Sequence, residues 1–143
     1  MKTLAFVFFA IVLTGCVSNT ISELKSDVGN FDGSFETENN YQVVYRNLRN
    51  MYRNCLEQAP MGTPVTTEGE IDIAIKEGQI RQRMIAQNVF LNMSVIDVNG
   101  ITDTKSKVTL NSVKGWLKIG TDLPAINDVE RWTKGDKNCW KKS

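Results

Sequence analysis

The chain has 143 residues, of which 41% are hydrophobic and 23% are charged, and this composition suits a single folded domain. Its 17 basic and 16 acidic side chains nearly balance, which argues against a nucleic-acid partner, since such binding rests on an excess of positive charge. The absence of histidine excludes Ser-His-Asp and Cys-His catalysis and most catalytic zinc sites, and no glycine-rich phosphate-binding motif is present. We therefore expect no cofactor and no metal.

The first fifteen residues have the order of a secretion signal. Lys2 supplies a positive charge, and the apolar run from Leu4 to Val12 is too short to span a bilayer as a helix. A buried N-terminal helix and an uncleaved anchor are the alternatives. The positive charge before the run and the small residues after it favour a cleaved signal peptide over residues 1–15.

The residues that end this segment, Leu13-Thr14-Gly15-Cys16, resemble the lipobox of bacterial lipoproteins. The resemblance covers these four residues and the apolar run before them, and it implies cleavage before Cys16 and lipid on that cysteine. Two or three acyl chains anchor a protein stably, because each buried methylene contributes about 0.8 kcal/mol. In the enterobacterial members of this class an aspartate at the next position favours the inner membrane. Val17 stands there, so the resemblance implies the outer membrane with the domain facing the periplasm.

Residues 16–40 are expected to form the lipidated N-terminus and a flexible tether, because Ser, Asn, Asp, Glu and Gly dominate them. A short helical turn is the alternative for part of this segment, since Ile21, Leu24 and Val28 are spaced for one. A single globular domain is predicted over residues 41–143. It opens with the clearest helical period of the chain, over residues 41–58, and Asn39 or Asn40 is suited to cap that helix.

Two hairpins are expected after this helix. The first is indicated by Ile71, Ile73 and Ile75, which alternate with less apolar residues ahead of a turn at Glu77-Gly78. With that turn, Ile75 pairs with Ile80 and Ile71 pairs with Met84, which makes one face of the hairpin apolar.

The second hairpin is marked by Asn99-Gly100, a pair that favours a type I′ turn because both residues tolerate positive φ. With that turn, Val95 pairs with Thr104, and Asn92 and Ser94 lie on the outer face of the sheet. The two hairpins together predict a four-stranded antiparallel meander.

The C-terminal end is predicted to be helical again. Thr121 or Asp122 can cap this helix, Pro124 suits its first turn, Ile126, Val129 and Trp132 recur at helical steps, and Gly135 ends it. The order helix, four strands, helix predicts an α+β fold, namely a two-layer sandwich with both helices on one face of the sheet.

The chain has three cysteines, of which one lies in the lipobox and two lie in the predicted domain. If Cys16 carries lipid, Cys55 and Cys139 remain, and in an oxidising compartment such a pair usually forms a disulfide. The bond would close a loop of more than half of the chain and stabilise the domain by about 4–5 kcal/mol in the chain-entropy model. A reactive thiol or a metal site is the alternative, but the chain has no C-x-x-C spacing and no histidine to support either.

Arg46, Arg49 and Arg53 are spaced by three and four residues, so they line one face of the first predicted helix. Such a basic stripe suits lipid phosphates, lipopolysaccharide or an acidic partner. A solvated helix face with no ligand is the more common meaning of such a pattern.

The tryptophans are candidates for an aromatic lining of a ligand or partner site. Trp132 falls on the apolar side of the last helix and is expected in the core, and Trp140 is expected to pack beside the disulfide. Trp116 follows the last predicted strand and is the candidate for partner binding.

Four carboxylates, those of Glu68, Glu70, Asp72 and Asp97, could pair in space as glycosidase carboxylates do. Their alternation along the chain fits an outer sheet face equally well.

These patterns favour a non-enzymatic, lipid-anchored lipoprotein of the bacterial envelope that binds a protein partner or an envelope component. The candidate surfaces are the arginine face and an exposed sheet face with its edge strand. A small-molecule-binding periplasmic module, with a pocket between helices and sheet, is the alternative. A cell-wall hydrolase is the least favoured.

Overall fold

The computed structural model describes residues 20–57, 64–86, 89–114 and 123–139. In chain order these residues form α1 (Ile21–Ser26), the 3-10 turn η1 (Val28–Asn30), β1 (Phe31–Thr37), α2 (Tyr41–Leu56), β2 (Val65–Asp72), β3 (Glu77–Ala86), β4 (Val89–Gly100), β5 (Ser106–Ser112) and α3 (Ile126–Thr133). The strands make one antiparallel five-stranded sheet in the order β1-β5-β4-β3-β2. The α+β class predicted from the sequence is confirmed, with one strand more than expected.

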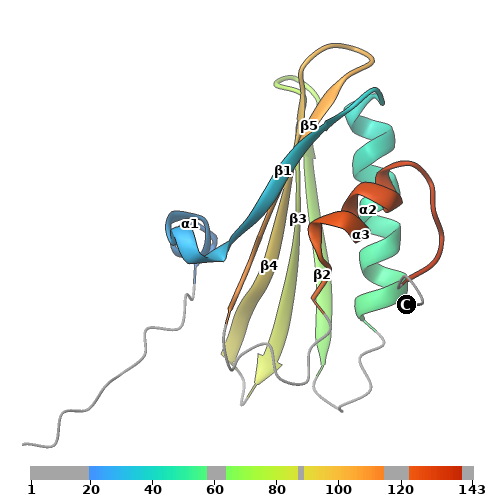
Figure 1. Cartoon of the computed structure of the whole chain (residues 1–143). Helices are drawn as coiled ribbons and strands as arrows, with labels where there is room; N and C mark the ends of the chain where they lie inside the picture. Colours follow the sequence, from blue (N-terminus) through green and yellow to red (C-terminus); the bar gives the residue numbers. More distant parts are fainter. Residues whose placement is uncertain (1–19, 58–63, 87–88, 115–122, 140–143) are drawn as a thin grey trace, which may run out of the picture.

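Helices α2 and α3 cover one face of the sheet, and the short helix α1 lies against the other (Figure 1). Alternation along β4 separates the two cores. Ile96 and Val98 pack under α2 and α3, whereas Val95 packs with Leu24 of α1. The fold is therefore the expected pair of layers plus a small helix on the second face.

Helix α2 confirms the predicted helical period and ends at Leu56. Asn40 is its N-cap, and the Asn40 Oδ1 atom accepts a hydrogen bond from the Gln42 amide at 2.8 Å. The apolar face of the helix is buried, and its members are Tyr41, Val44, Tyr45, Leu48, Met51, Tyr52 and Leu56.

Residues 20–40 form α1, η1 and β1 in place of the tether that their composition predicts. Strand β1 pairs with β5, with Phe35 opposite Val108, and so becomes an edge of the sheet. The polar composition of this segment hides two apolar anchors: Phe35 packs against the core under α2 and α3, and Leu24 is fully buried on the other face. A strand at an edge needs few apolar residues, so its composition does not distinguish it from a linker.

The first hairpin turns earlier than predicted. Its turn is Ile73–Lys76, and β2 begins at Val65, so Ile71 pairs with Gly78 instead of Met84. Lys76 has a φ of 56°, a left-handed conformation of the kind tight turns require.

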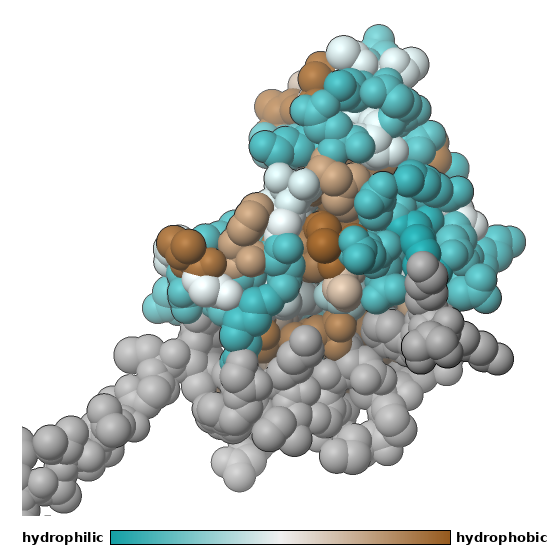
Figure 2. Space-filling model, viewed as in Figure 1, coloured by the Kyte–Doolittle hydropathy of each residue, from teal (hydrophilic) through white to brown (hydrophobic). Residues whose placement is uncertain are grey.

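This earlier turn exposes the isoleucines that were expected to face the core. Ile73 is 67% exposed, Ile75 is 61% exposed, and Ile101 of the neighbouring β4–β5 connection is 48% exposed. Figure 2 shows apolar side chains at this end of the molecule. The two connections are held together because the Gly100 amide donates to the Lys76 carbonyl at 2.8 Å, and Lys76 forms an ion pair with Asp103 at 2.7 Å.

In the second hairpin, the register of β5 against β4 differs from the predicted register by an odd number of residues. The faces of β5 are therefore reversed relative to β4. Residues 101–105 form the connection, so Val98 pairs with Val108 and the predicted Val95–Thr104 pair does not form. Asn92 and Ser94, expected outside, are buried. The Ser94 hydroxyl lies 3.1 Å from Gln82 Oε1 and 3.5 Å from the Tyr52 hydroxyl, and burial raises the pKa of Tyr52.

Helix α3 confirms the predicted C-terminal helix, although it begins at Ile126, two residues after Pro124. The expected caps, Thr121 and Asp122, lie outside the described residues. Trp132 is fully buried, as expected, and its ring makes an edge-on contact with Tyr52 at 6.1 Å between centroids.

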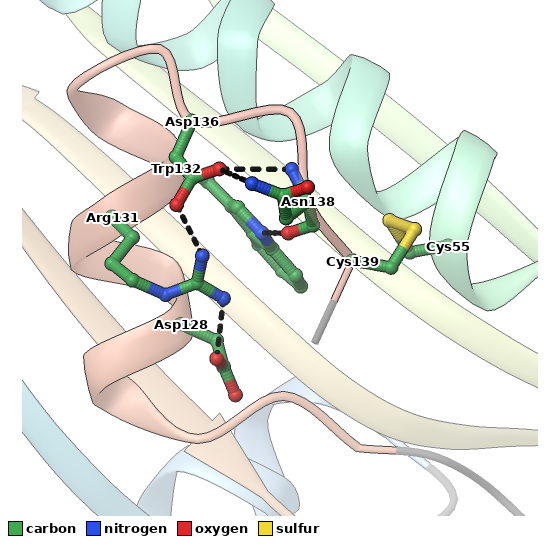
Figure 3. Close-up of a disulfide and its surroundings, with 7 residues drawn as sticks. All are labelled: Cys55, Asp128, Arg131, Trp132, Asp136, Asn138 and Cys139. Carbon is green, nitrogen blue, oxygen red and sulfur yellow. Dashed lines mark hydrogen bonds and ion pairs between the residues drawn. A yellow bond between two sulfur atoms is a disulfide. The ribbon is translucent and has the colours of Figure 1, made fainter. Parts of the chain in front are cut away.

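The segment after α3 is fastened to α2 by the Cys55–Cys139 disulfide, which confirms the predicted pairing, with 5.3 Å between the two Cα atoms (Figure 3). The Trp132 indole also donates to the Asn138 carbonyl at 2.9 Å. Hydrogen bonds from Asn138, together with the Arg131 guanidinium, lower the pKa of Asp136.

Candidate functional site

The three arginines predicted to share a helix face do share one. Arg46 and Arg53 are exposed and Arg49 is half-buried, and together they form what is called here the arginine stripe. Arg46 and Arg53 are seven positions apart in α2, or about 10 Å along its axis. The helix runs beside β2, the outermost strand on that side of the sheet (Figure 1).

Arg49 packs directly on the backbone of β2. A Cβ atom added at Gly69 would lie 3.2 Å from both Cδ and Nε of Arg49, and it would overlap the Tyr45 hydroxyl. The Nε atom of Arg49 is buried and has no hydrogen-bond partner. Burial raises the pKa of Tyr45, and the charge of Arg49 opposes that rise. The stripe is therefore attached to the sheet edge by its middle member, which is a contact the sequence could not indicate.

The stripe differs from the other arginines of the chain in its ion pairs. Arg81, Arg83 and Arg131 each form an ion pair with at least one carboxylate. None of the three stripe arginines has such a pair with any carboxylate in the described segments. Their charge is thus available to an external anion, and guanidinium groups bind carboxylates and phosphates with two parallel hydrogen bonds.

The side of β2 that faces away from β3 pairs with no other strand of the described residues. The Ile85 amide donates to the Pro64 carbonyl at 2.9 Å, so even-numbered residues of this strand hydrogen-bond to β3. The Thr67 amide instead donates to the Glu57 carboxylate at 2.8 Å, which shows that odd-numbered residues point outward. The outward groups of Gly69 and Ile71 follow from the same alternation.

The acidic residues of β2 lie on its other face and are occupied. Glu68 pairs with Arg81 and Arg83, and Glu70 pairs with Arg81. The face of the edge strand that lies away from α2 is therefore largely neutralised, and the excess positive charge is on the α2 side.

A hollow of about 440 Å³ on the face that carries α1 brings together several of the carboxylates considered for hydrolysis. Its lining includes Glu70, Asp72 and Asp97. Asp97 is bound to Lys25 at 2.7 Å and to Gln79 at 2.9 Å, while Asp72 accepts a hydrogen bond from the Ala74 amide at 2.9 Å. With Glu70 also paired, these carboxylates are engaged in structural contacts and offer little support for a pair that acts on a substrate.

A second hollow, of about 330 Å³, lies between α2 and the turn after α3. Its lining includes Asn47, Asn50, Asn54 and Trp132. Trp132 is fully buried, so its ring does not form an aromatic platform there. The space between the helices and the sheet is filled by large side chains of the core, among them Tyr52 and Leu48.

Trp116, the tryptophan proposed for partner binding, lies outside the described residues, as do Trp140 and the lipid-site candidate Cys16. Sequence reasoning missed the exposed isoleucines, because their alternation is also the pattern of a strand that is buried on one face.

Comparison with known proteins provides no relative from which a site could be transferred, since no family model, no curated protein and no solved structure matches the chain. Across the described segments, no helix has the length and apolar character needed to cross a membrane. The same residues contain no cluster of three or more cysteine, aspartate and glutamate side chains suited to a metal ion.

Proposed function

We propose that this protein is a non-enzymatic lipoprotein of the bacterial envelope, anchored by lipid on Cys16, whose domain binds a negatively charged protein partner or envelope component through the arginine stripe. The observation that supports the export which this anchor requires is the Cys55–Cys139 disulfide. Disulfides persist in oxidising compartments such as the periplasm, and this bond uses both cysteines other than the one in the lipobox.

The binding part is supported by the charge of the stripe. Three guanidinium groups on neighbouring helix turns, with no ion pair to a described carboxylate, keep a local positive field on a chain whose overall charge is near zero. The small-molecule-binding alternative has less support, because the core between the helices and the sheet is packed with side chains.

The anchor is tested by the intact mass of the full chain recovered from the membranes of a Gram-negative host. We expect a mass that corresponds to cleavage before Cys16 plus acyl chains, with Cys55 and Cys139 alkylated only after reduction. The Cys16→Ser variant should lose the acyl mass and leave the membrane fraction. An unlipidated wild-type chain with alkylatable thiols would contradict the proposal.

The binding surface is tested with two doubly charge-reversed variants. Arg46→Glu/Arg53→Glu alters the stripe, while Lys107→Glu/Lys137→Glu makes the same change in net charge at exposed lysines elsewhere. A component retained from solubilised envelopes by the wild type and the lysine variant, but not by the arginine variant, is the expected result. Equal retention by both variants would remove the stripe from the proposal.

A further inference from the structure

We propose that the edge of β2 accepts an extended segment of a partner protein as a sixth strand, and that the arginine stripe selects a segment with acidic side chains at alternate positions. This inference rests on the proposed function, because it specifies the chemistry of the partner at the same surface. Strand addition takes its affinity from main-chain hydrogen bonds and its specificity from alternate side chains.

The main-chain part rests on the direction of the β2 backbone. Gly69 and Ile71 direct their amides and carbonyls away from β3, since the alternation is fixed by the Pro64–Ile85 and Thr67–Glu57 hydrogen bonds. At Thr67, a carboxylate of the chain itself already occupies an outward amide. An added strand would therefore begin beyond Thr67 and run along Gly69 and Ile71.

The selective part rests on the position of the stripe. Every second side chain of an added strand would point to the α2 side of the sheet, where Arg49 lies across Gly69. Alternate residues of a strand are about 7 Å apart, and the stripe spans about 10 Å along the helix. Two or three acidic side chains at alternate positions therefore match the three guanidinium groups.

The other side of an added strand meets a different environment. Glu68 and Glu70 are already paired with Arg81 and Arg83 there, so this side provides no matching positive charge. The preferred segment is thus acidic on one face only, with small polar or apolar residues between the acidic ones.

A second copy of this chain fits the edge poorly. If two β2 strands paired antiparallel about Gly69, Glu68 of one copy would lie opposite Glu70 of the other, and the two Arg49 side chains would share a face. Like charges directly opposite one another destabilise a strand pair. A segment with the opposite charge on the α2 side avoids this repulsion.

The experiment uses a blocked synthetic peptide that alternates glutamate with threonine. One control peptide has the same composition with the glutamates in a single block, and the other has lysine in place of glutamate. Binding to the disulfide-bonded protein is measured by isothermal titration calorimetry, and amide shifts of Gly69 and Ile71 are followed by nuclear magnetic resonance. Only the alternating glutamate peptide should bind and shift these amides.

Two variants test separately the contribution of the arginine charges and that of the main-chain hydrogen bonds to peptide binding. Arg46→Glu/Arg53→Glu should weaken binding by about tenfold or more, an effect equal to the loss of one strong contact. Ile71→Pro should weaken it similarly, because proline removes an outward amide that β3 does not use, and edge strands tolerate proline at such positions. Lys107→Glu/Lys137→Glu is the control with matched charge and should bind like the wild type.

Several outcomes would overturn the inference: no binding of the alternating peptide, equal binding of the block peptide, or an Ile71→Pro variant that is folded and binds normally. Binding to vesicles that contain phosphatidylglycerol tests whether the stripe recognises an anionic lipid surface instead of a peptide. If the stripe arginines are needed for vesicle binding while no peptide binds, strand addition is wrong but an anionic envelope component remains. If the peptide binds and the chain from membranes carries no lipid, the anchor fails and strand addition stands.

Discussion

At the scale of single residues, the contact between α2 and the sheet depends on glycine. Tyr45 lies over Gly69 and Gly78, which belong to the neighbouring strands β2 and β3. An added Cβ at Gly78 would lie 2.7 Å from a carbon of the Tyr45 ring, whereas at Gly69 the obstacle is the Tyr45 hydroxyl and the Arg49 side chain. Because glycine has no side chain at these two positions, the large ring of Tyr45 can approach the backbone of the sheet closely.

This arrangement predicts different rescue behaviour at the two glycines. Gly78→Ala should lower the free energy of unfolding by about 1–3 kcal/mol, because the aromatic ring must move. Gly69→Ala should lower the free energy of unfolding by less. Part of this loss should disappear in the Tyr45→Phe background, which lacks the obstructing hydroxyl. Urea unfolding of the single and double variants measures the coupling. A Tyr45→Phe change that rescued Gly78→Ala equally well would contradict this packing.

At the scale of elements, one side chain couples the start of α2 to the far hairpin. Asn40 caps the helix through its Oδ1 atom, and its Nδ2 atom donates to the Asp103 carbonyl at 2.8 Å. The same end of the sheet carries the Lys76–Asp103 ion pair, so the helix start and both hairpin connections form one structural unit.

We expect Asn40→Ala to lower the free energy of unfolding by about 1 kcal/mol or more, since it removes a helix cap and a link between elements. Asn40→Ser keeps a capping oxygen but lacks the amide donor, so it should recover most of the cap contribution. Chemical unfolding of the three proteins under identical conditions gives the comparison. If serine and alanine cost the same, the link to Asp103 and not the cap is what stabilises this end.

At the scale of the whole molecule, the disulfide and α3 complete the domain from its far C-terminal side. The bond joins residues 84 positions apart in sequence. The segment that it fastens brings the Trp132–Asn138 hydrogen bond and the ion pairs of Arg131 with Asp128 and Asp136 (Figure 3). Long-range closure of this kind mainly reduces the freedom of the unfolded chain.

Reduction should therefore lower the free energy of unfolding by up to about 4–5 kcal/mol, the chain-entropy value for a loop of this size. Urea unfolding with and without reductant measures the loss, and a Cys55→Ser/Cys139→Ser variant should be as unstable without reductant as the reduced protein. The same unfolding midpoint for oxidised and reduced protein would show that the segment after α3 is held by its non-covalent contacts alone.

Helices α2 and α3, the disulfide and the composition of the arginine stripe were within reach of the sequence alone. Helical periodicity is a local property, so α2, α3 and the shared face of the three arginines follow from spacing. Once the lipobox motif is set against Cys16, only Cys55 and Cys139 remain to pair with each other. The candidate lipid site is likewise a local motif, although it lies outside the described residues.

Strand register, the first strand and the position of the stripe beside an edge were decided by tertiary structure. Several registers of the hairpins give an apolar face, and the choice among them depends on Tyr45 needing glycines beneath it and on which face of β4 meets α2. Because the even-numbered face of β4 packs under α2, Ser94 is buried against Tyr52. Strand pairing joins residues that are distant in sequence, so its free energy belongs to contacts between elements, whereas a helix satisfies most of its backbone within its own segment.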